Sequence, residues 1–191
     1  MILPDRAVLP SPVGPLFVAA SRFGLCALEF DGEKRFAATR GRQGARDRGA
    51  DDPLEPVRAW LARYFEAWGS TRTGSGRGLP DGREIAIELV GSDFERRVWA
   101  ALLDIPAGAT ESYGAVAARL GRPDGARAVG LAAARNPVAI VVPCHRVLGA
   151  DGSLTGFGGG LPRKVALLEH ERRAVGSAAH AHAGAQLPLD F

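Results

Sequence analysis

Residues 136–147, NPVAIVVPCHRV, place a cysteine at the end of an apolar run. Asn136-Pro137 favours a turn, and the continuous apolar run Val138–Val142 predicts a buried extended segment. Pro143-Cys144-His145-Arg146-Val147 follows at once. The Cys144 thiol is therefore expected where a buried element emerges.

The residues next to Cys144 suit a reactive thiol. The thiolate is the nucleophile, and a free cysteine has a pKa near ~8.5, so a reactive cysteine needs a nearby imidazole, cation or helix N-terminus. His145 and Arg146 supply an imidazole and a cation, but His145 reaches the sulfur only if the chain turns at Cys144. The spacing alone leaves two interpretations open, a nucleophile and a buried structural thiol.

Other chemistries fit this chain less well. Two cysteines do not make a disulfide framework or a cysteine-rich zinc cluster, and Cys26 is predicted to be an inert residue of an apolar strand. A papain-like protease would need a distant histidine after its cysteine. Glycines 156–160 fail the dinucleotide-binding pattern because Leu161 stands where the third glycine is required. The remaining histidines show no metal-ligand spacing: His170, His180 and His182.

The composition is that of a soluble globular chain. It has 191 residues, of which 46% are hydrophobic and 24% charged, enough for one compact domain or two small ones. No window approaches the ~20 apolar residues of a membrane helix, and the first ten residues lack the layout of a secretory signal. We therefore expect an intracellular protein with no membrane association.

Basic residues gather in one third of the chain. Between positions 119 and 164 there are seven basic residues against two acidic ones, while the remainder is slightly acidic. This distribution indicates a face that meets a polyanion such as nucleic acid, although a solvated surface can give the same count. The seven are Arg119, Arg122, Arg127, Arg135, Arg146, Arg163 and Lys164.

The N-terminal part predicts a small sheet and one helix. Turn signals separate three apolar segments that are expected to form an antiparallel meander: Ala7–Leu9, Leu16–Ala20 and Leu25–Phe30. Apolar residues then recur at helical spacing from Leu54 to Phe65. Residues 40–52 are predicted to be a solvated loop, and the glycine-rich stretch 69–83 is predicted to be a linker.

Three helices are predicted before the cysteine. Ser92 and Glu95 fit a capping box that opens a helix ending near Leu103. A second helix is expected from its cap Ser112 to Leu120, and a third from about Gly125 to Ala134. The second and third have the outline of a helix-turn-helix, which many helical hairpins share without binding DNA.

The chain resembles the O6-alkylguanine-DNA alkyltransferases, also called methylated-DNA–protein-cysteine methyltransferases. The pentapeptide Pro143–Val147 is the most specific motif. The resemblance is strong from Phe94 to Glu171 and loose in the N-terminal third, through Ser11–Leu16 and Gly24-Leu25. The further matching motifs are Ile105–Gly108, Ser112–Gly114, Arg127–Gly130, Asn136-Pro137, Gly158–Leu161 and Glu171.

The resemblance implies a fold of two domains. The first is an α/β domain of ribonuclease-H-like kind with an antiparallel sheet and a helix, over residues 1–83. The second is a mainly α winged helix-turn-helix domain over residues 84–173. Residues 174–191 are expected to be a flexible tail.

The resemblance also implies a single-turnover repair reaction without a cofactor or metal. Cys144 would accept the alkyl group of O6-alkylguanine, and of O4-alkylthymine, and would keep it as a thioether. His145 would take the thiol proton through a bridging water, and Glu171 would orient the imidazole. Tyr113 would donate a hydrogen bond to the departing base. Asn136 would brace the turn before the cysteine.

The implied partner is double-stranded DNA, bound through its minor groove by a monomer. Arg127 would enter the stack when the damaged nucleotide is flipped out. Small residues would let the recognition helix approach the groove: Ala126, Ala128 and Gly130, with Ala132 and Ala133. Val147, Phe157, Gly158 and Gly159 would line the guanine pocket. The small, apolar Phe157-Gly158 pair leaves the preference between methyl and bulkier adducts open.

Two further hypotheses come from the remaining sequence. The chain could instead be a DNA-binding or lesion-sensing module in which Cys144 is idle or regulatory. The ending Gln186–Phe191, QLPLDF, resembles peptides by which bacterial repair and replication proteins dock on the sliding clamp, and it could equally pack on its own domain. The resemblance places the protein in the bacterial cytoplasm, associated with the nucleoid.

Overall fold

Three antiparallel strands and one helix form the N-terminal part of the computed structural model, which describes residues 4–30, 52–66, 68 and 79–176. The strands are β1 (Asp5–Leu9), β2 (Leu16–Ser21) and β3 (Gly24–Glu29), in the order β1-β2-β3. Leu16, Val18 and Ala20 alternate along β2 and are fully buried, as expected for one face of a strand that covers a core. The predicted meander is confirmed.

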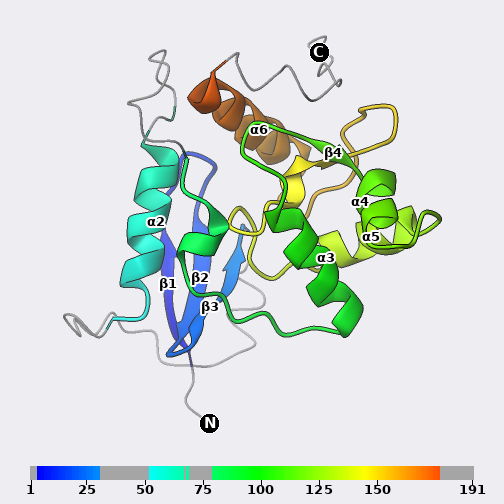
Figure 1. The fold of residues 1–191 in the computed structure, drawn as a ribbon. Helices are drawn as coiled ribbons and strands as arrows, with labels where there is room; N and C mark the ends of the chain where they lie inside the picture. The colour runs from blue at the N-terminus through cyan, green and yellow to red at the C-terminus, as the bar shows by residue number, and fades with distance from the viewer. Residues whose placement is uncertain (1–3, 31–51, 67, 69–78, 177–191) are drawn as a thin grey trace.

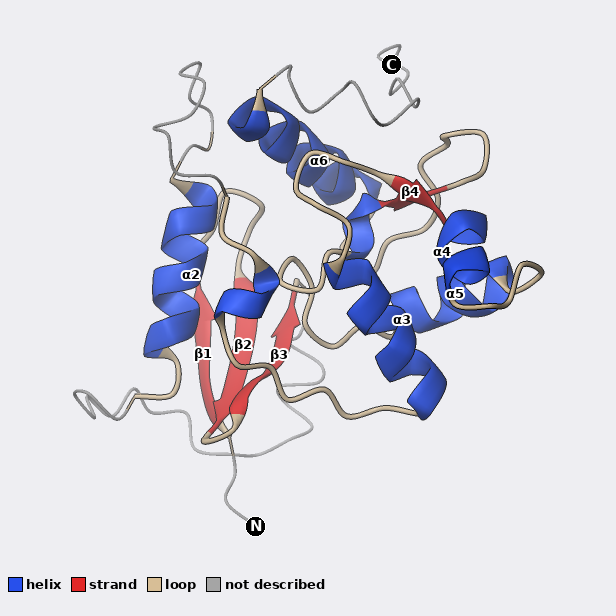
Figure 2. Cartoon of the chain, in the orientation of Figure 1, coloured by secondary structure: helices blue, strands red, loops and turns tan. Residues whose placement is uncertain are grey.

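Helix α2 (Glu55–Phe65) lies beside this sheet (Figures 1 and 2). Its buried residues are Val57, Trp60, Leu61 and Tyr64, the spacing of a helix with one apolar stripe. This helix was predicted from the same periodicity. The predicted loop 40–52 lies outside the described residues except for Asp52, and so does most of the predicted linker.

The described end of the predicted linker is ordered. Asp81 caps a 3-10 helix, Gly82–Glu84, and its carbonyl accepts a 2.9 Å hydrogen bond from Trp60 Nε1. A Cβ on Gly82 would lie 2.3 Å from the carbonyl oxygen of Val141. Gly82 is therefore packed against the segment that precedes the cysteine and Asp81 is bonded to α2, which differs from a free linker.

Four helices build the C-terminal part: α3 (Asp93–Leu103), α4 (Tyr113–Arg119), α5 (Ala126–Ala134) and α6 (Leu161–Val175). The predicted capping box is present, with Glu95 N donating to Ser92 Oγ and Ser92 N donating to the Glu95 carboxylate. Ser112 caps α4, as predicted. Strands β4 (Glu111–Ser112) and β5 (Val147–Leu148) pair in parallel. The last helix includes Ala174 and Val175, which were predicted to belong to a flexible tail.

The run 138–142 is buried but not extended, which corrects the prediction. Val142 N donates to Val138 O and Val141 N donates to Ala139 O, so the chain turns back on itself. Ile140 has a φ of 70°, a conformation that a β-branched residue adopts only under constraint. The constraint comes from the start of the run, where Leu28 of β3 exchanges backbone hydrogen bonds with Pro137 and Ala139. The turn carries the chain back toward Asn136 before it reaches the cysteine.

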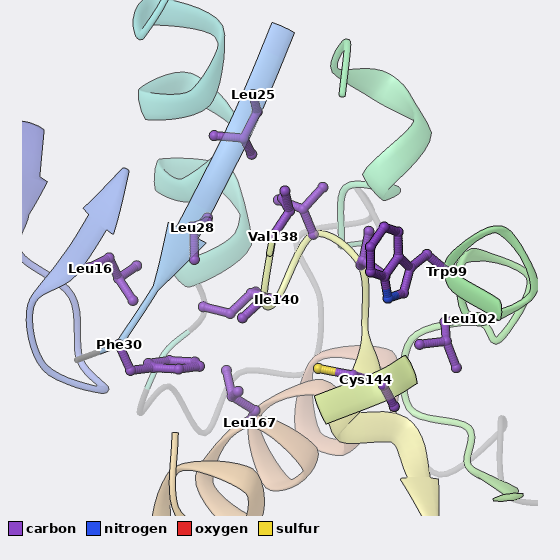
Figure 3. Close-up of a cluster of buried hydrophobic side chains, with 14 of the residues drawn as sticks. Leu16, Leu25, Leu28, Phe30, Trp99, Leu102, Val138, Ile140, Cys144 and Leu167 are labelled. Atoms are coloured by element: carbon purple, nitrogen blue, oxygen red, sulfur yellow. The ribbon is translucent and has the colours of Figure 1, made fainter. Parts of the chain in front are cut away.

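One hydrophobic core joins the two parts of the chain (Figure 3). Leu16, Leu25, Leu28 and Phe30 from the strands belong to the same cluster as residues of the C-terminal part, among them Trp99, Leu102, Val138, Ile140, Cys144 and Leu167. The cysteine segment is therefore held between the sheet and the helices. Within the part of the chain that the structure describes, no helix is both long and apolar enough to cross a bilayer.

Candidate active site

Cys144 opens a short 3-10 helix, Cys144–Arg146. This is the turn that the sequence required for His145 to come near the sulfur. The Cys144 side chain is buried, and Figure 3 shows its sulfur pointing toward the side of the core where Phe30, Ile140 and Leu167 lie. The thiol is thus set at the meeting point of the sheet and the helices.

Asn136 holds both the turn and the sulfur. Its Nδ2 donates to the Val142 carbonyl at 2.8 Å and to Cys144 Sγ at 3.1 Å, and its Oδ1 accepts from Val138 N at 3.0 Å. The side chain closes the strained turn with two of these bonds and stabilises negative charge on the sulfur with the third. The predicted bracing contact is present, together with a direct contact to the thiol.

Glu171 is fully buried and accepts five hydrogen bonds. Oε1 accepts from Tyr64 OH at 2.8 Å, His145 Nε2 at 2.9 Å and Arg146 Nη2 at 2.7 Å. Oε2 accepts from Arg146 Nε at 2.8 Å and Gly108 N at 3.1 Å. A buried carboxylate survives only with such compensation, and here Arg146 supplies a bidentate cation.

The predicted pair of His145 and Glu171 is present. Because an ionised carboxylate can only accept, the proton of this hydrogen bond belongs to His145 Nε2. The other ring nitrogen, Nδ1, is buried and has no hydrogen-bond partner among the described residues. His145 therefore presents a bare Nδ1, the atom that can accept a proton. No direct hydrogen bond links His145 to Cys144 Sγ in the described part of the chain.

Burial sets the resting protonation of the site. Burial raises the pKa of the Cys144 thiol, against the opposing effects of the Asn136 hydrogen bond and the Lys164 charge. Burial likewise lowers the pKa of His145, against the opposing charge of Glu171. Burial disfavours the Glu171 carboxylate, but the charges and hydrogen bonds of His145 and Arg146 outweigh it and hold the pKa of Glu171 far below its ordinary value. At neutral pH the site thus holds a thiol, a neutral imidazole and a carboxylate.

Lys164 is a buried cation, which corrects its place in the predicted basic face. Its Nζ donates to the Val147 carbonyl at 2.7 Å and to the Thr155 carbonyl at 3.1 Å. Burial lowers the pKa of Lys164 to about 8. The ammonium group holds β5 to the following loop and adds a positive charge near the sulfur.

A cavity of about 180 Å³ lies beside Cys144. The predicted pocket residues Phe157, Gly158 and Gly159 line it, whereas Val147 is buried and does not. Tyr113 also does not line it. The full lining comes from both parts of the chain: Leu28, Glu29, Phe30, Ala133, Ala134, Asn136, Ala139, Cys144, Phe157, Gly158 and Gly159.

The predicted DNA-binding residues lie together on α5. Arg127 and Ala128 are exposed, and Ala126 and Gly130 are partly exposed. A Cβ on Gly130 would lie 3.8 Å from the Tyr113 ring, so Tyr113 packs beside this helix. Arg127 forms no hydrogen bond or ion pair within the described residues, and its guanidinium is available to a ligand.

The basic third of the chain is not one continuous surface, which corrects the sequence reading. Arg146 and Lys164 are buried because they compensate Glu171 and two backbone carbonyls. Arg163 donates to the carbonyls of Val13 and Gly159. Further pairing ties Arg119 to Asp104 and Glu111, and Arg135 to Glu95. Of the seven basic residues, Arg122 and Arg127 remain as exposed cations without an ion pair in the described part.

Three contacts of the site were not predicted: those of Tyr64, Gly108 and Arg146 with Glu171. Tyr64 belongs to the apolar stripe of α2, which gives no sign of a polar role. Arg146 is predicted both as a cation beside Cys144 and as part of a basic face, whereas its guanidinium binds the Glu171 carboxylate. Cys26 donates to the carbonyl of Ala19 within the sheet, as a structural thiol would. Among the described residues, no group of three or more histidines, cysteines or acids could hold a metal ion.

Two family models match the chain. Residues 6–68 match the model described as 6-O-methylguanine DNA methyltransferase, ribonuclease-like domain. Residues 93–173 match the model described as 6-O-methylguanine DNA methyltransferase, DNA binding domain. Together the matches include the sheet, α2 and the helices around Cys144.

Several curated relatives are methylated-DNA–protein-cysteine methyltransferases. The methylated-DNA–protein-cysteine methyltransferase of Methanosarcina barkeri is 38% identical over 167 residues, which are 86% of this chain and 94% of that protein. The protein of that name from Mycobacterium leprae is 59% identical over 91 residues, 48% of this chain and 55% of that protein. The chain spans about half the length of the mycobacterial relatives that it matches.

Solved structures share the fold over most of the chain. The crystal structure of Mycobacterium tuberculosis OGT in complex with DNA has 40% sequence identity and a TM-score of 0.67, and the match covers 88% of this chain and 94% of that one. The structure of the Mycobacterium tuberculosis O6-methylguanine methyltransferase has 36% identity and a TM-score of 0.65, over 93% of this chain and 98% of that one.

Acidification is expected to destabilise the folded chain. Burial lowers the pKa of both His145 and His170, so between neutral pH and about 5.5 the unfolded chain takes up protons that the native state does not. Below the ordinary histidine pKa of about 6.5, each of these two residues lowers the free energy of unfolding by up to about 1.4 kcal/mol per pH unit. The free energy of unfolding, measured with urea, should therefore fall by ~1–2 kcal/mol over this range.

His170→Gln provides the control, because it removes one of the two buried imidazoles and should reduce the pH dependence of the free energy of unfolding. A free energy of unfolding that stays constant or rises on acidification would contradict this assignment.

Proposed function

The chain belongs to the methylated-DNA–protein-cysteine methyltransferase family. We propose that the protein repairs DNA by direct reversal, and that Cys144 accepts the alkyl group of O6-alkylguanine once and irreversibly. O4-alkylthymine is a second substrate. The observation that carries the proposal is a buried thiol at a cavity, bonded to Asn136 and placed one residue before an imidazole that a buried carboxylate orients.

The reaction is a single displacement that starts from the neutral thiol. The Cys144 proton passes to His145 Nδ1 through one water molecule, and the sulfur forms a bond to the alkyl carbon as the bond from that carbon to guanine O6 breaks. Glu171 stabilises the imidazolium that forms, and Asn136 Nδ2 and the Lys164 charge stabilise the developing thiolate. The thioether is the final state, the departing guanine anion takes up one proton as His145 gives up the proton from the thiol, and no cofactor or metal takes part.

Tyr113 assists the leaving base. As the O6 bond breaks, the guanine ring gains negative charge, and a phenol hydrogen bond to it is strongest in the transition state. Tyr113 stands at the first position of α4 beside α5. Neither Tyr113 nor Val147 lines the cavity, and Tyr113 would meet the everted base from the first turn of α4.

Double-stranded DNA binds along α5. A relative with 40% identity has been crystallised in complex with DNA, which supports this partner. The small exposed residues allow the helix to approach the minor groove, and Arg127 fills the gap left by the flipped nucleotide. The helices α4 and α5 then serve as the helix-turn-helix, in a winged domain that follows a ribonuclease-H-like one. The protein acts as a monomer in the bacterial cytoplasm, at the nucleoid.

The alternative is a lesion-binding module with an idle cysteine. The contacts of Asn136 with Cys144 and of His145 with Glu171 favour the transferase, because a module that only binds DNA needs no oriented base beside a thiol.

The C-terminal tail provides a contact with a protein partner, in addition to the DNA contact of α5. We propose that Gln186–Phe191 docks on the bacterial sliding clamp; these residues lie outside the described part of the chain. Titration of purified clamp with a peptide of residues 184–191 should give saturable binding, and a peptide with Leu187, Leu189 and Phe191 changed to alanine should not bind. A flat titration with the unchanged peptide would contradict this docking.

Alkyl transfer to Cys144 is the direct test of the function. After incubation with a duplex that contains O6-methylguanine, the intact protein should gain the mass of one methyl group, located on the Cys144 peptide. Cys144→Ala should bind the same duplex without the gain, and Cys26→Ala should gain it like the unchanged protein. Stoichiometric binding with no change in mass would favour the lesion-binding module instead.

Arg127→Ala should separate DNA recognition from chemistry. Because Arg127 is exposed on α5 and not in contact with the sulfur, its loss should slow repair of duplex DNA by at least about tenfold, the effect of one lost charged contact. The rate with free O6-benzylguanine should change little. Arg172→Ala, which removes an exposed arginine from α6, serves as the control. Equal losses with duplex and free base would exclude Arg127 from base flipping.

A further inference from the structure

We infer that Tyr64 is a positioning residue for the alkyl transfer, holding the Glu171 carboxylate in place for His145 from the N-terminal part of the chain. The inference rests on the proposed function. Its basis is one oxygen atom: Glu171 Oε1 accepts hydrogen bonds from both Tyr64 OH, at 2.8 Å, and His145 Nε2, at 2.9 Å. Tyr64, 107 positions before Glu171 in the sequence, thus shares this acceptor with the proposed base His145.

Tyr64 is held more firmly than a side chain that only fills space. It is fully buried and stacks on Trp60, with the ring centroids 5.2 Å apart and the planes 12° from parallel. His170 hydrogen-bonds the Tyr64 carbonyl at 2.6 Å and packs edge-on against its ring. Both ends of the residue are therefore anchored to α6 at positions 170 and 171, so the phenol has little freedom to leave Glu171.

The phenol also adjusts the charge that Glu171 presents to His145. The groups facing Glu171 are the Arg146 guanidinium, the His145 imidazole, the Tyr64 phenol and the Gly108 amide. The charges that act on His145 are those of Glu171, Arg146 and Lys164. Arg146 approaches both carboxylate oxygens, while Tyr64 donates only to the oxygen that His145 uses. Without the phenol, Oε1 would lose one hydrogen-bond donor, so its negative charge beside the imidazole would be less compensated. The Glu171 carboxylate would also be freer to shift.

Two consequences follow for the reaction. More negative charge on Oε1 favours the protonated imidazole, so the pKa of His145 should rise. His145 should then already be protonated, and unable to accept the thiol proton, at a higher pH. A carboxylate that shifts also no longer fixes the direction of Nδ1. The N-terminal part therefore contributes to the chemistry, and its role extends beyond support of the fold.

Tyr64→Phe tests the inference while keeping the aromatic packing. With free O6-benzylguanine, whose reaction needs no DNA contact, the rate of benzyl transfer at neutral pH should fall by about tenfold, the effect of one hydrogen bond to a charged group. The acidic limb of the pH-rate profile should also move to higher pH. Ser21→Ala is the matched control, because it removes a hydroxyl of the same sheet domain that donates to Glu88; its rate and profile should equal those of the unchanged protein.

A purely structural role for Tyr64 predicts a different result. The variant would then lose thermal stability, but its pH-rate profile would stay in place, and that outcome overturns the inference. An unchanged rate and profile would also overturn it.

Imidazole NMR separates this inference from the proposed function. If the unchanged protein gains no methyl group from a duplex that contains O6-methylguanine, the proposed function fails, while the His145 resonances still report on the contact with Glu171. Tyr64→Phe should then shift the Nε2 proton of His145 and raise the pKa of the ring. Identical His145 titrations in the two proteins would contradict the positioning role.

Discussion

A single buried negative charge organises this protein. Burying a carboxylate is costly unless it is paired and hydrogen-bonded, and Glu171 meets that demand with donors from three separate segments of the chain. α2 supplies Tyr64, the turn after α3 supplies the Gly108 amide, and the helical turn at the cysteine supplies His145 and Arg146. The donors to one carboxylate therefore bring the two parts of the chain together at the point where the chemistry is proposed.

The same arrangement explains how a cysteine can be both buried and reactive. Burial keeps the thiol protonated and His145 neutral, so the resting site carries no thiolate that could be oxidised. Asn136 and Lys164 supply the stabilisation that a thiolate needs once it forms. The strained turn at Ile140 holds Asn136 beside the sulfur, because the Asn136 side chain bonds both ends of that turn as well as Cys144 Sγ.

Local residue patterns predicted the regular elements well and the tertiary contacts poorly. The Ser92 cap, the stripe of α2 and the three strands follow from short-range spacing, and all are present. The turn at 138–142 was missed because its apolar residues indicate burial in any conformation, while its geometry depends on Leu28 of β3 and on Asn136. The pairing of His145 with Glu171 came from the family resemblance. Tyr64, Arg146 and Lys164 could not have been assigned, since an apolar stripe and a count of charges say nothing about which polar group is buried beside which.

The most direct measurement of the central claim is the pH dependence of Cys144 alkylation by iodoacetamide in Glu171→Gln, followed on the Cys144 peptide by mass spectrometry. If the carboxylate of Glu171 makes His145 an effective acceptor of the thiol proton, its neutralisation should raise the apparent pKa of Cys144 and slow alkylation at neutral pH. An alkylation profile that coincides with that of the unchanged protein, in a variant that remains folded, would contradict the account.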